Sequence, residues 1–302
     1  MSSGIAYKIL KSTNASKRIF KRLLSKPARG GNAVSKKKMK RSLQIKEWEL
    51  DGFKLLTAEN SSTENKHIIF LHGGAYIAEA NAGHRRIIEK LALSYNFRVT
   101  FIDYPLAPEH QAAYTMEILH KAYKAILKNS KEDTFYLFGD SAGGGLALSF
   151  MQVLRDEGEL ELPEKTVLLS PWLDISLSNK EIENFLDKEV LLHFESLREC
   201  GRLYAGNLDL KDPRISPIYG NLDHLNTIKV FASNYELLYP DCVLLKEKAD
   251  SARGTSLELT IRDRMIHDWV ILPGRESERT LKEIADFFLA KERQTENLPA
   301  AG

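Results

Sequence analysis

A glycine-flanked serine stands between two segments of different periodicity. Residues 139–143 read Gly-Asp-Ser-Ala-Gly, with a β-like run at 134–138 before them and a helix-like run at 146–151 after them. A sharp strand-to-helix turn at this point would present the Ser141 hydroxyl above a sheet, and glycines keep Cβ atoms out of the turn. The motif alone also fits a plain connector of small residues, but its context favours a nucleophilic Ser141.

A candidate acid and a candidate base follow this serine along the chain. A serine hydroxyl requires an adjacent base, and His267 lies in the loop after a strand-like run at 257–261. Glu236 follows the strand-like run at 228–232 and is the predicted partner that orients the imidazole. Asp241 is an alternative acid, and it ranks below Glu236 because it falls inside a predicted helix at 240–252. The predicted catalytic residues are therefore Ser141, Glu236 and His267.

A glycine-rich loop supplies candidates for an oxyanion hole. The apolar run 68–71 leads into His72, Gly73, Gly74 and Ala75. Backbone N–H groups that leave a strand end can converge on one oxygen. We expect Gly74, Ala75 and Ala142 to donate, with Gly73 also in the hole and shaping its loop. Ala75 serves in this way provided that its φ is negative.

These motifs together resemble the hormone-sensitive-lipase family of carboxylesterases in the α/β-hydrolase superfamily. The matching segments are residues 72–75, 103–110, 139–144, 170–172, 212–217 and 266–268. The resemblance covers roughly residues 45–290 and implies ester hydrolysis through an acyl-enzyme, with no metal and no organic cofactor. Three positions depart from the family pattern, since Ala75 replaces the third glycine of the loop, Glu236 replaces the usual aspartate and Pro105 replaces the common arginine.

Alternating strand and helix patterns must position these residues. A predicted hairpin at 43–58 is followed by strand-like runs at 67–71, 98–103, 134–138, 166–170, 228–232 and 257–261. The helix-like runs are 82–95, 113–129, 142–157, 240–252 and 276–291. This alternation predicts an α/β-hydrolase fold with a mainly parallel central sheet flanked by helices. Residues 175–225 interrupt the alternation and are the predicted helical cap insertion in a catalytic domain at 47–302.

The first 46 residues differ in charge from the rest of the chain. They hold 14 Lys and Arg and no Asp or Glu, although the whole chain has a net charge of only +2. A helix is predicted at 5–24, and the segment is interpreted as part of the cap. Contact with an anionic membrane is the alternative. Nucleic acid is not an expected partner, because no aromatic residues interleave the basic ones.

Composition and cysteine content limit the remaining function classes. The chain has 302 residues, of which 43% are hydrophobic, with no apolar run long enough to span a membrane and no visible secretory signal. Two cysteines are too few for a disulfide scaffold, which favours the cytoplasm. The histidines outside the triad lack metal-ligand spacing, so no catalytic metal is expected.

The predicted function is a serine carboxylesterase that acts on small, short-to-medium acyl esters. An amidase or peptidase on the same fold and a membrane-associated lipase remain alternatives. A non-catalytic ligand receptor is disfavoured because Ser141, Glu236 and His267 are all present. The expected partner is a small-molecule ester, and a homodimer is left open.

Overall fold

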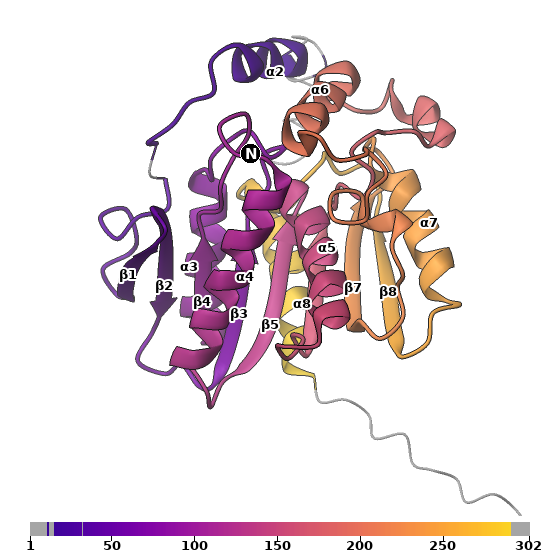
Figure 1. Ribbon diagram of the computed structural model, residues 1–302. Helices are drawn as coiled ribbons and strands as arrows, with labels where there is room; N and C mark the ends of the chain where they lie inside the picture. The colour runs from indigo at the N-terminus through magenta and orange to yellow at the C-terminus, as the bar shows by residue number, and fades with distance from the viewer. Residues whose placement is uncertain (1–10, 12–14, 32, 291–302) are drawn as a thin grey trace, which may run out of the picture.

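The computed structural model describes residues 11, 15–31 and 33–290. Within them, eight strands form one sheet in the order β1-β2-β4-β3-β5-β6-β7-β8 (Figure 1). β1 and β2 form an antiparallel hairpin, β2 joins β4 in antiparallel fashion, and all later pairs are parallel. The strand bounds are β1 Gln44–Leu50, β2 Phe53–Glu59, β3 Lys66–Leu71, β4 Arg98–Ile102, β5 Thr134–Asp140, β6 Lys165–Leu169, β7 Asn226–Ser233 and β8 Thr255–Arg262.

The central strands are buried on both faces, and their side chains alternate between two cores. In β3, Ile69 and Leu71 belong to one core, whereas Ile68 and Phe70 belong to the other. Helices α4 (Ala112–Asn129), α5 (Ala142–Glu157) and α7 (Tyr239–Ala249) contribute to the first core. Helices α3 (Ala82–Tyr95) and α8 (Arg275–Leu289) contribute to the second, which agrees with their places on opposite sides of the sheet in Figure 1. Helices therefore cover both faces, as a parallel sheet requires.

Short helices lie above one end of the strands (Figure 1). Helix α2 (Ala15–Ser25) lies against α6 (Phe194–Ala205) at the top of the molecule in Figure 1. The turns η1 (Lys180–Phe185) and η2 (Pro217–Tyr219) belong to the same chain segment as α6, and η3 (Trp269–Ile271) packs on α3 and α8. Helices α2 and α6, which are far apart in the sequence, thus lie side by side above the strands (Figure 1).

The predicted fold class is confirmed, with small shifts at the element ends. Every predicted strand and helix after residue 43 is present, although β6 ends one residue earlier than predicted and α7 ends at Ala249 rather than at 252. Of the predicted helix at 5–24, residues 15–24 lie in α2, and residues 5–10 and 12–14 fall outside the described residues. In the described ranges, no helix combines the length and apolar character that crossing a bilayer requires. The division into a catalytic domain and a cap stays a prediction.

Candidate active site

Ser141 occupies a strained turn between β5 and α5. Its backbone has φ 50° and ψ −117°, a combination that non-glycine residues rarely adopt. The turn is possible because glycines stand two residues before and two residues after Ser141. A Cβ on Gly139 would lie 2.2 Å from the Gly143 carbonyl oxygen, and a Cβ on Gly143 would lie 2.1 Å from the Leu71 carbonyl oxygen. Such strain costs about 1–3 kcal/mol, and it persists because the surrounding backbone is tightly packed.

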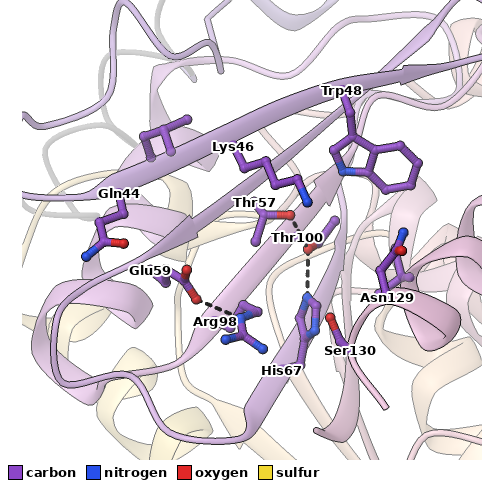
Figure 2. Close-up of a pocket in the computed structure, with 12 residues that line it drawn as sticks. Gln44, Lys46, Trp48, Thr57, Glu59, His67, Arg98, Thr100, Asn129 and Ser130 are labelled. Atoms are coloured by element: carbon purple, nitrogen blue, oxygen red, sulfur yellow. Dashed lines mark hydrogen bonds and ion pairs between the residues drawn. The ribbon is translucent and has the colours of Figure 1, made fainter. Parts of the chain in front are cut away.

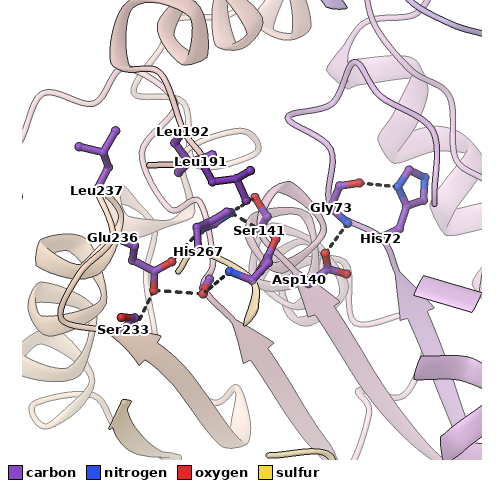
Figure 3. A network of polar contacts seen from close by, with 12 residues as sticks. His72, Gly73, Asp140, Ser141, Leu191, Leu192, Ser233, Glu236, Leu237 and His267 are labelled. Atoms are coloured by element: carbon purple, nitrogen blue, oxygen red, sulfur yellow. Dashed lines mark hydrogen bonds and ion pairs between the residues drawn. The ribbon is translucent and has the colours of Figure 1, made fainter. Parts of the chain in front are cut away.

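Ser141, His267 and Glu236 form one continuous chain of contacts (Figure 3). The Nε2 atom of His267 lies 2.9 Å from Ser141 Oγ, and its Nδ1 lies 2.6 Å from Glu236 Oε2. All three residues are buried. They follow β5, β8 and β7, so the carboxyl ends of three parallel strands bring them together. The arrangement links a nucleophile to a base and the base to an orienting carboxylate.

Two serines that the sequence reading missed hold the Glu236 carboxylate. Its Oε1 accepts hydrogen bonds from the Ser233 backbone N–H at 2.7 Å and from Ser170 Oγ at 3.0 Å. Ser233 ends β7 and Ser170 directly follows β6, so their places at strand ends were the available signal. The alternative acid, Asp241, instead accepts a hydrogen bond from Asn179 Nδ2 at 2.8 Å.

A second carboxylate, also missed, approaches the same imidazole from the other side. Asp268 Oδ2 lies 3.2 Å from His267 Nε2, and the Asp268 side chain is only 7% exposed. Burial raises the pKa of the Asp268 carboxyl to about 7, against the opposing effect of His267. Burial disfavours a charged His267, yet Asp268 and Glu236 together raise its pKa well above the ordinary value. The position directly after the histidine was the only signal in the sequence.

The loop after β3 faces Ser141 with most of its amides unoccupied. Gly73 N–H donates to Asp140 Oδ2 at 2.9 Å, so Gly73 shapes the loop and its own N–H is not available to a substrate. In the described part of the chain, the N–H groups of Gly74, Ala75 and Ala142 have no hydrogen-bond acceptor. The condition of a negative φ at Ala75 is not met, because its φ is 54° and the loop turns through the left-handed region at this alanine. The Ala75 N–H is nevertheless without an acceptor in the described part of the chain, so the positive φ does not remove it as a candidate donor.

Asp140 and His84 brace this loop from below. His84 Nδ1 accepts a hydrogen bond from the Asn81 backbone N–H at 2.9 Å, which directs the Nε2 proton toward Asp140 Oδ2 at 3.1 Å. Burial opposes charge on His84, but Asp140 raises its pKa. The same carboxylate oxygen binds Gly73, so α3, β5 and the loop after β3 are tied together directly behind Ser141.

Comparison with known proteins shows the family of the chain. A family model described as the alpha/beta hydrolase fold matches residues 68–271. The chain belongs to the α/β-hydrolase family. The matched range contains the loop after β3 together with Ser141, Glu236 and His267, whereas α2 and the β1–β2 hairpin lie outside it.

Relatives of this hydrolase carry names of ester-cleaving enzymes. It is 30% identical over 213 residues to an esterase of Acinetobacter venetianus, covering 70% of each chain. It is 30% identical over 231 residues to an acetyl-hydrolase of Streptomyces hygroscopicus, covering 75% of this chain and 76% of the relative. A solved hormone-sensitive lipase from a metagenome library is 27% identical with a TM-score of 0.83, covering 95% and 98% of the two chains. The predicted family is thereby confirmed, and a carboxylic ester hydrolase is supported.

A small pocket opens above Ser141 in this hydrolase. Its volume is about 220 Å³, and apolar side chains from three segments that are far apart in the sequence line it. These side chains are Ile19, Phe20 and Leu23 of α2, Leu191 and Leu192 of the segment before α6, and Ile271. Helix α2 of the basic N-terminal segment therefore covers the site with apolar side chains.

A larger cavity of about 570 Å³ lies elsewhere, on the face of β1, β2 and β4 (Figure 2). Its polar side chains bind one another: His67 Nε2 lies 2.7 Å from Thr100 Oγ1, which lies 2.8 Å from Thr57 Oγ1. Arg98 Nε donates to Glu59 Oε2 at 2.7 Å. Ser130 and His67 both line this cavity, but the two ring nitrogens of His67 contact Asp133 and Thr100, and no hydrogen bond joins His67 to Ser130 in the described part of the chain (Figure 2). We therefore assign the chemistry to the smaller pocket.

Proposed function

We propose that this hydrolase is a serine carboxylesterase that cleaves small, short-to-medium acyl esters through an acyl-enzyme. One observation carries the proposal: His267 Nε2 lies 2.9 Å from Ser141 Oγ while Nδ1 lies 2.6 Å from Glu236 Oε2. A serine becomes a nucleophile only when a base can take its proton, and this geometry provides one. The esterase and acetyl-hydrolase names of the relatives support the same reaction class.

In the first half-reaction, Ser141 Oγ attacks the ester carbonyl carbon and its proton passes to His267 Nε2. The carbonyl oxygen becomes an oxyanion, which the N–H groups of Gly74, Ala75 and Ala142 are proposed to bind. Each such donor contributes on the order of 3 kcal/mol of transition-state stabilisation. The intermediate then expels the alcohol oxygen, which takes the proton from Nε2, and an acyl-Ser141 ester remains.

In the second half-reaction, water repeats the sequence on the acyl-enzyme. His267 Nε2 takes a proton from the water as its oxygen attacks the acyl carbon, and the proton returns to Ser141 Oγ as the acid leaves. Glu236 keeps the Nδ1 proton in place and stabilises the imidazolium in both halves. Its own orientation is held by Ser170 and Ser233.

The pocket supports the proposed size of the acyl group. Its volume of about 220 Å³ falls below the roughly 300–1,000 Å³ that is typical for drug-sized ligands. Phe20, Leu23, Leu191 and Leu192 wall it with apolar surface, which favours an alkyl chain over a polar one. We therefore expect turnover to fall steeply once the acyl chain exceeds medium length.

The basic N-terminal segment is proposed as part of the cap rather than as a membrane anchor. Phe20 of α2 is 7% exposed and faces the pocket, whereas Lys17, Lys21 and Arg22 are exposed. Apart from Ile19, which is 51% exposed, the large apolar side chains of α2 are buried or half-buried, which leaves little apolar surface to insert into a bilayer. Co-sedimentation with anionic vesicles should therefore be equal with and without residues 1–42, and binding that depends on this segment would favour the membrane-associated lipase.

The experiment that tests the function is hydrolysis of p-nitrophenyl esters from acetate to long chains, beside matched p-nitroanilides. We expect ester turnover that peaks at short-to-medium chains and is lost in Ser141→Ala. Ser149→Ala is the control, since Ser149 lies further along the same helix and only donates to the Pro213 carbonyl. Preferential cleavage of the anilides would favour the amidase alternative, and ester turnover that survives Ser141→Ala would overturn the mechanism.

A further inference from the structure

The triad leaves the Asp268 carboxylate without an assigned role. Its Oδ2 lies 3.2 Å from His267 Nε2, and its Oδ1 is buried with no hydrogen-bond partner among the described residues. The side chain is 7% exposed and lines the same pocket as Ser141. A buried carboxylate oxygen without a donor is energetically costly. A ligand that brings a donor would remove this cost.

The contact with Nε2 places Asp268 on the alcohol side of the bound ester. His267 must give its proton to the departing alcohol oxygen, so that oxygen comes within about 3 Å of Nε2. Asp268 Oδ2 is itself 3.2 Å from Nε2. The two oxygens are therefore at most about 6 Å apart, within reach of a substituent two or three bonds from the ester oxygen.

The charges around the pocket favour a cationic substituent. Its ionisable lining side chains are three carboxylates and two histidines, with no Lys or Arg among the lining residues. Both oxygens of Glu79 are occupied by the N–H groups of Gly30 and Gly31, at 2.5 and 2.7 Å. Asp140 is bound through Oδ2 by Gly73 and His84, and its Oδ1 is buried without a partner among the described residues, as is Oδ1 of Asp268. What distinguishes Asp268 is its place, because its Oδ2 lies 3.2 Å from His267 Nε2, the ring nitrogen that faces Ser141.

We propose that Asp268 is a specificity residue that selects esters whose alcohol portion carries a protonated amine two or three bonds from the ester oxygen. The proposal rests on the serine carboxylesterase function and names its substrate class. An ammonium N–H donated to Asp268 would form a charge-assisted hydrogen bond in a site with little water. It would also neutralise the carboxylate beside Nε2, which makes the neutral, basic form of His267 easier to reach.

The backbone allows a clean test of this role. Asp268 has φ 51° and ψ 39°, in the left-handed region that asparagine tolerates well. Its N–H donates to Ser170 Oγ at 3.4 Å, and an asparagine keeps this contact. Asp268→Asn therefore removes the charge while it keeps the side-chain shape. Asp263→Asn is the matched control, because it neutralises an exposed carboxylate in the same loop that is not among the lining residues of the pocket.

The experiment compares two isosteric butyrate esters, 2-(dimethylamino)ethyl butyrate and 3-methylbutyl butyrate. The first ester carries an N–H⁺ at the position where the second carries a C–H. We expect the wild type to favour the amine ester in kcat/KM by about 10- to 100-fold, the usual worth of a hydrogen bond to a charged group. The preference should collapse to within about threefold in Asp268→Asn and persist in Asp263→Asn. It should also persist in 1 M salt, which screens steering by surface charges.

A second substrate pair and an inhibition assay keep the proposal falsifiable. Ethyl 4-(dimethylamino)butanoate and ethyl 5-methylhexanoate carry the same difference on the acyl side, where no preference is expected. N,N-dimethylethanolamine should inhibit the wild type more strongly than 3-methylbutan-1-ol, a readout that remains if Asp268→Asn does not fold. Equal kcat/KM for the first pair, or an unchanged preference in Asp268→Asn, would overturn the inference. Loss of all ester turnover, including that of p-nitrophenyl esters, would instead refute the proposed function.

Discussion

Two carboxylates contact the imidazole of His267, one at each ring nitrogen. Glu236 Oε2 lies 2.6 Å from Nδ1, and Asp268 Oδ2 lies 3.2 Å from Nε2. Burial opposes the imidazolium, but these charges raise the pKa of His267 well above its ordinary value. Glu189, which also interacts electrostatically with His267, and the more distant Asp140 and His84 complete the ionisable surroundings.

The raised pKa of His267 has a direct consequence for activity. Only neutral imidazole is a base, so kcat/KM should fall as pH drops through this raised pKa. Asp268→Asn removes one stabilising negative charge and should move the acidic limb to lower pH by about one unit or more. Initial rates on a neutral ester from pH 5 to 9 measure the shift. Asp263→Asn, an exposed change in the same loop, should leave the acidic limb in place. If the acidic limb also stays in place in Asp268→Asn, Asp268 does not raise the pKa of His267.

The identity of the triad acid gives a second prediction at this scale. Glu236→Gln should lower kcat by roughly 10³–10⁴-fold, because an amide can neither fix the Nδ1 tautomer nor stabilise the imidazolium. Asp241→Asn should change kcat by less than about threefold, since Asp241 binds Asn179 rather than His267. Steady-state kinetics on one ester separate the two, and the reverse ranking would reassign the acid to Asp241.

At the scale of elements, helix α5 decides where the nucleophile stands. Its first residue follows Ser141 directly, and its N-terminal turn is pressed against the end of β3 at Gly143. Its other end is capped by Gly158, which has φ 65° and open space around the missing Cβ. The two glycines therefore serve different purposes: one permits a close approach of two backbones, and the other permits a left-handed cap.

Substitution at the two ends of α5 should separate these purposes. Gly143→Ala drives a Cβ to 2.1 Å from the Leu71 carbonyl oxygen, so we expect a loss of about 3 kcal/mol or more in unfolding free energy, together with loss of turnover. Gly158→Ala meets only left-handed strain and should cost about 1 kcal/mol with turnover retained. Denaturant titration and ester kinetics on both variants test this, and equal stability losses would argue against the steric explanation.

At the scale of the whole molecule, the segment after α2 is strapped across the loops that carry the site. Arg29 Nη1 donates to the Ile77 carbonyl at 2.6 Å, and Nη2 donates to the carbonyl of Ala107 at 2.7 Å and to Glu109 Oε2 at 2.6 Å. Glu79 accepts from the backbone N–H groups just beyond Arg29. This strap holds α2 over the pocket, so an N-terminal segment completes a site built from strands in the middle of the chain.

Release of the strap should weaken substrate binding more than chemistry. Arg29→Ala leaves two buried carbonyls without their donor, so we expect a loss of about 2 kcal/mol in unfolding free energy and a several-fold higher KM for apolar esters, with kcat changed less. Arg41→Ala, an exposed change in the same basic segment, should alter neither. Thermal unfolding and KM for p-nitrophenyl butyrate measure both effects, and an unchanged KM in Arg29→Ala would mean that α2 does not help to form the pocket.

The sequence by itself determined the features that depend on local pattern. Alternation and helical periodicity located the strands and helices, because burial on both faces of a parallel sheet leaves a strong apolar signal. The glycines around Ser141 predicted the turn, since only residues without Cβ fit it. Ser141, Glu236 and His267 could be chosen because each follows a strand, and parallel strands bring their carboxyl ends to one edge.

The tertiary structure alone decided what depends on distance and dihedral angle. Residue type does not reveal that Asp268 turns back to His267 Nε2, that Gly73 gives its N–H to Asp140, or that Ala75 adopts φ 54°. Nor does it reveal that α2 covers a pocket whose nucleophile lies over a hundred residues further along the chain. The Gly73–Asp140 bond and the place of α2 over the pocket join segments that are far apart in the sequence, so they arise only when the sheet has formed. The Asp268–His267 contact and the φ of Ala75 depend on the backbone conformation of their loops, which residue type does not fix.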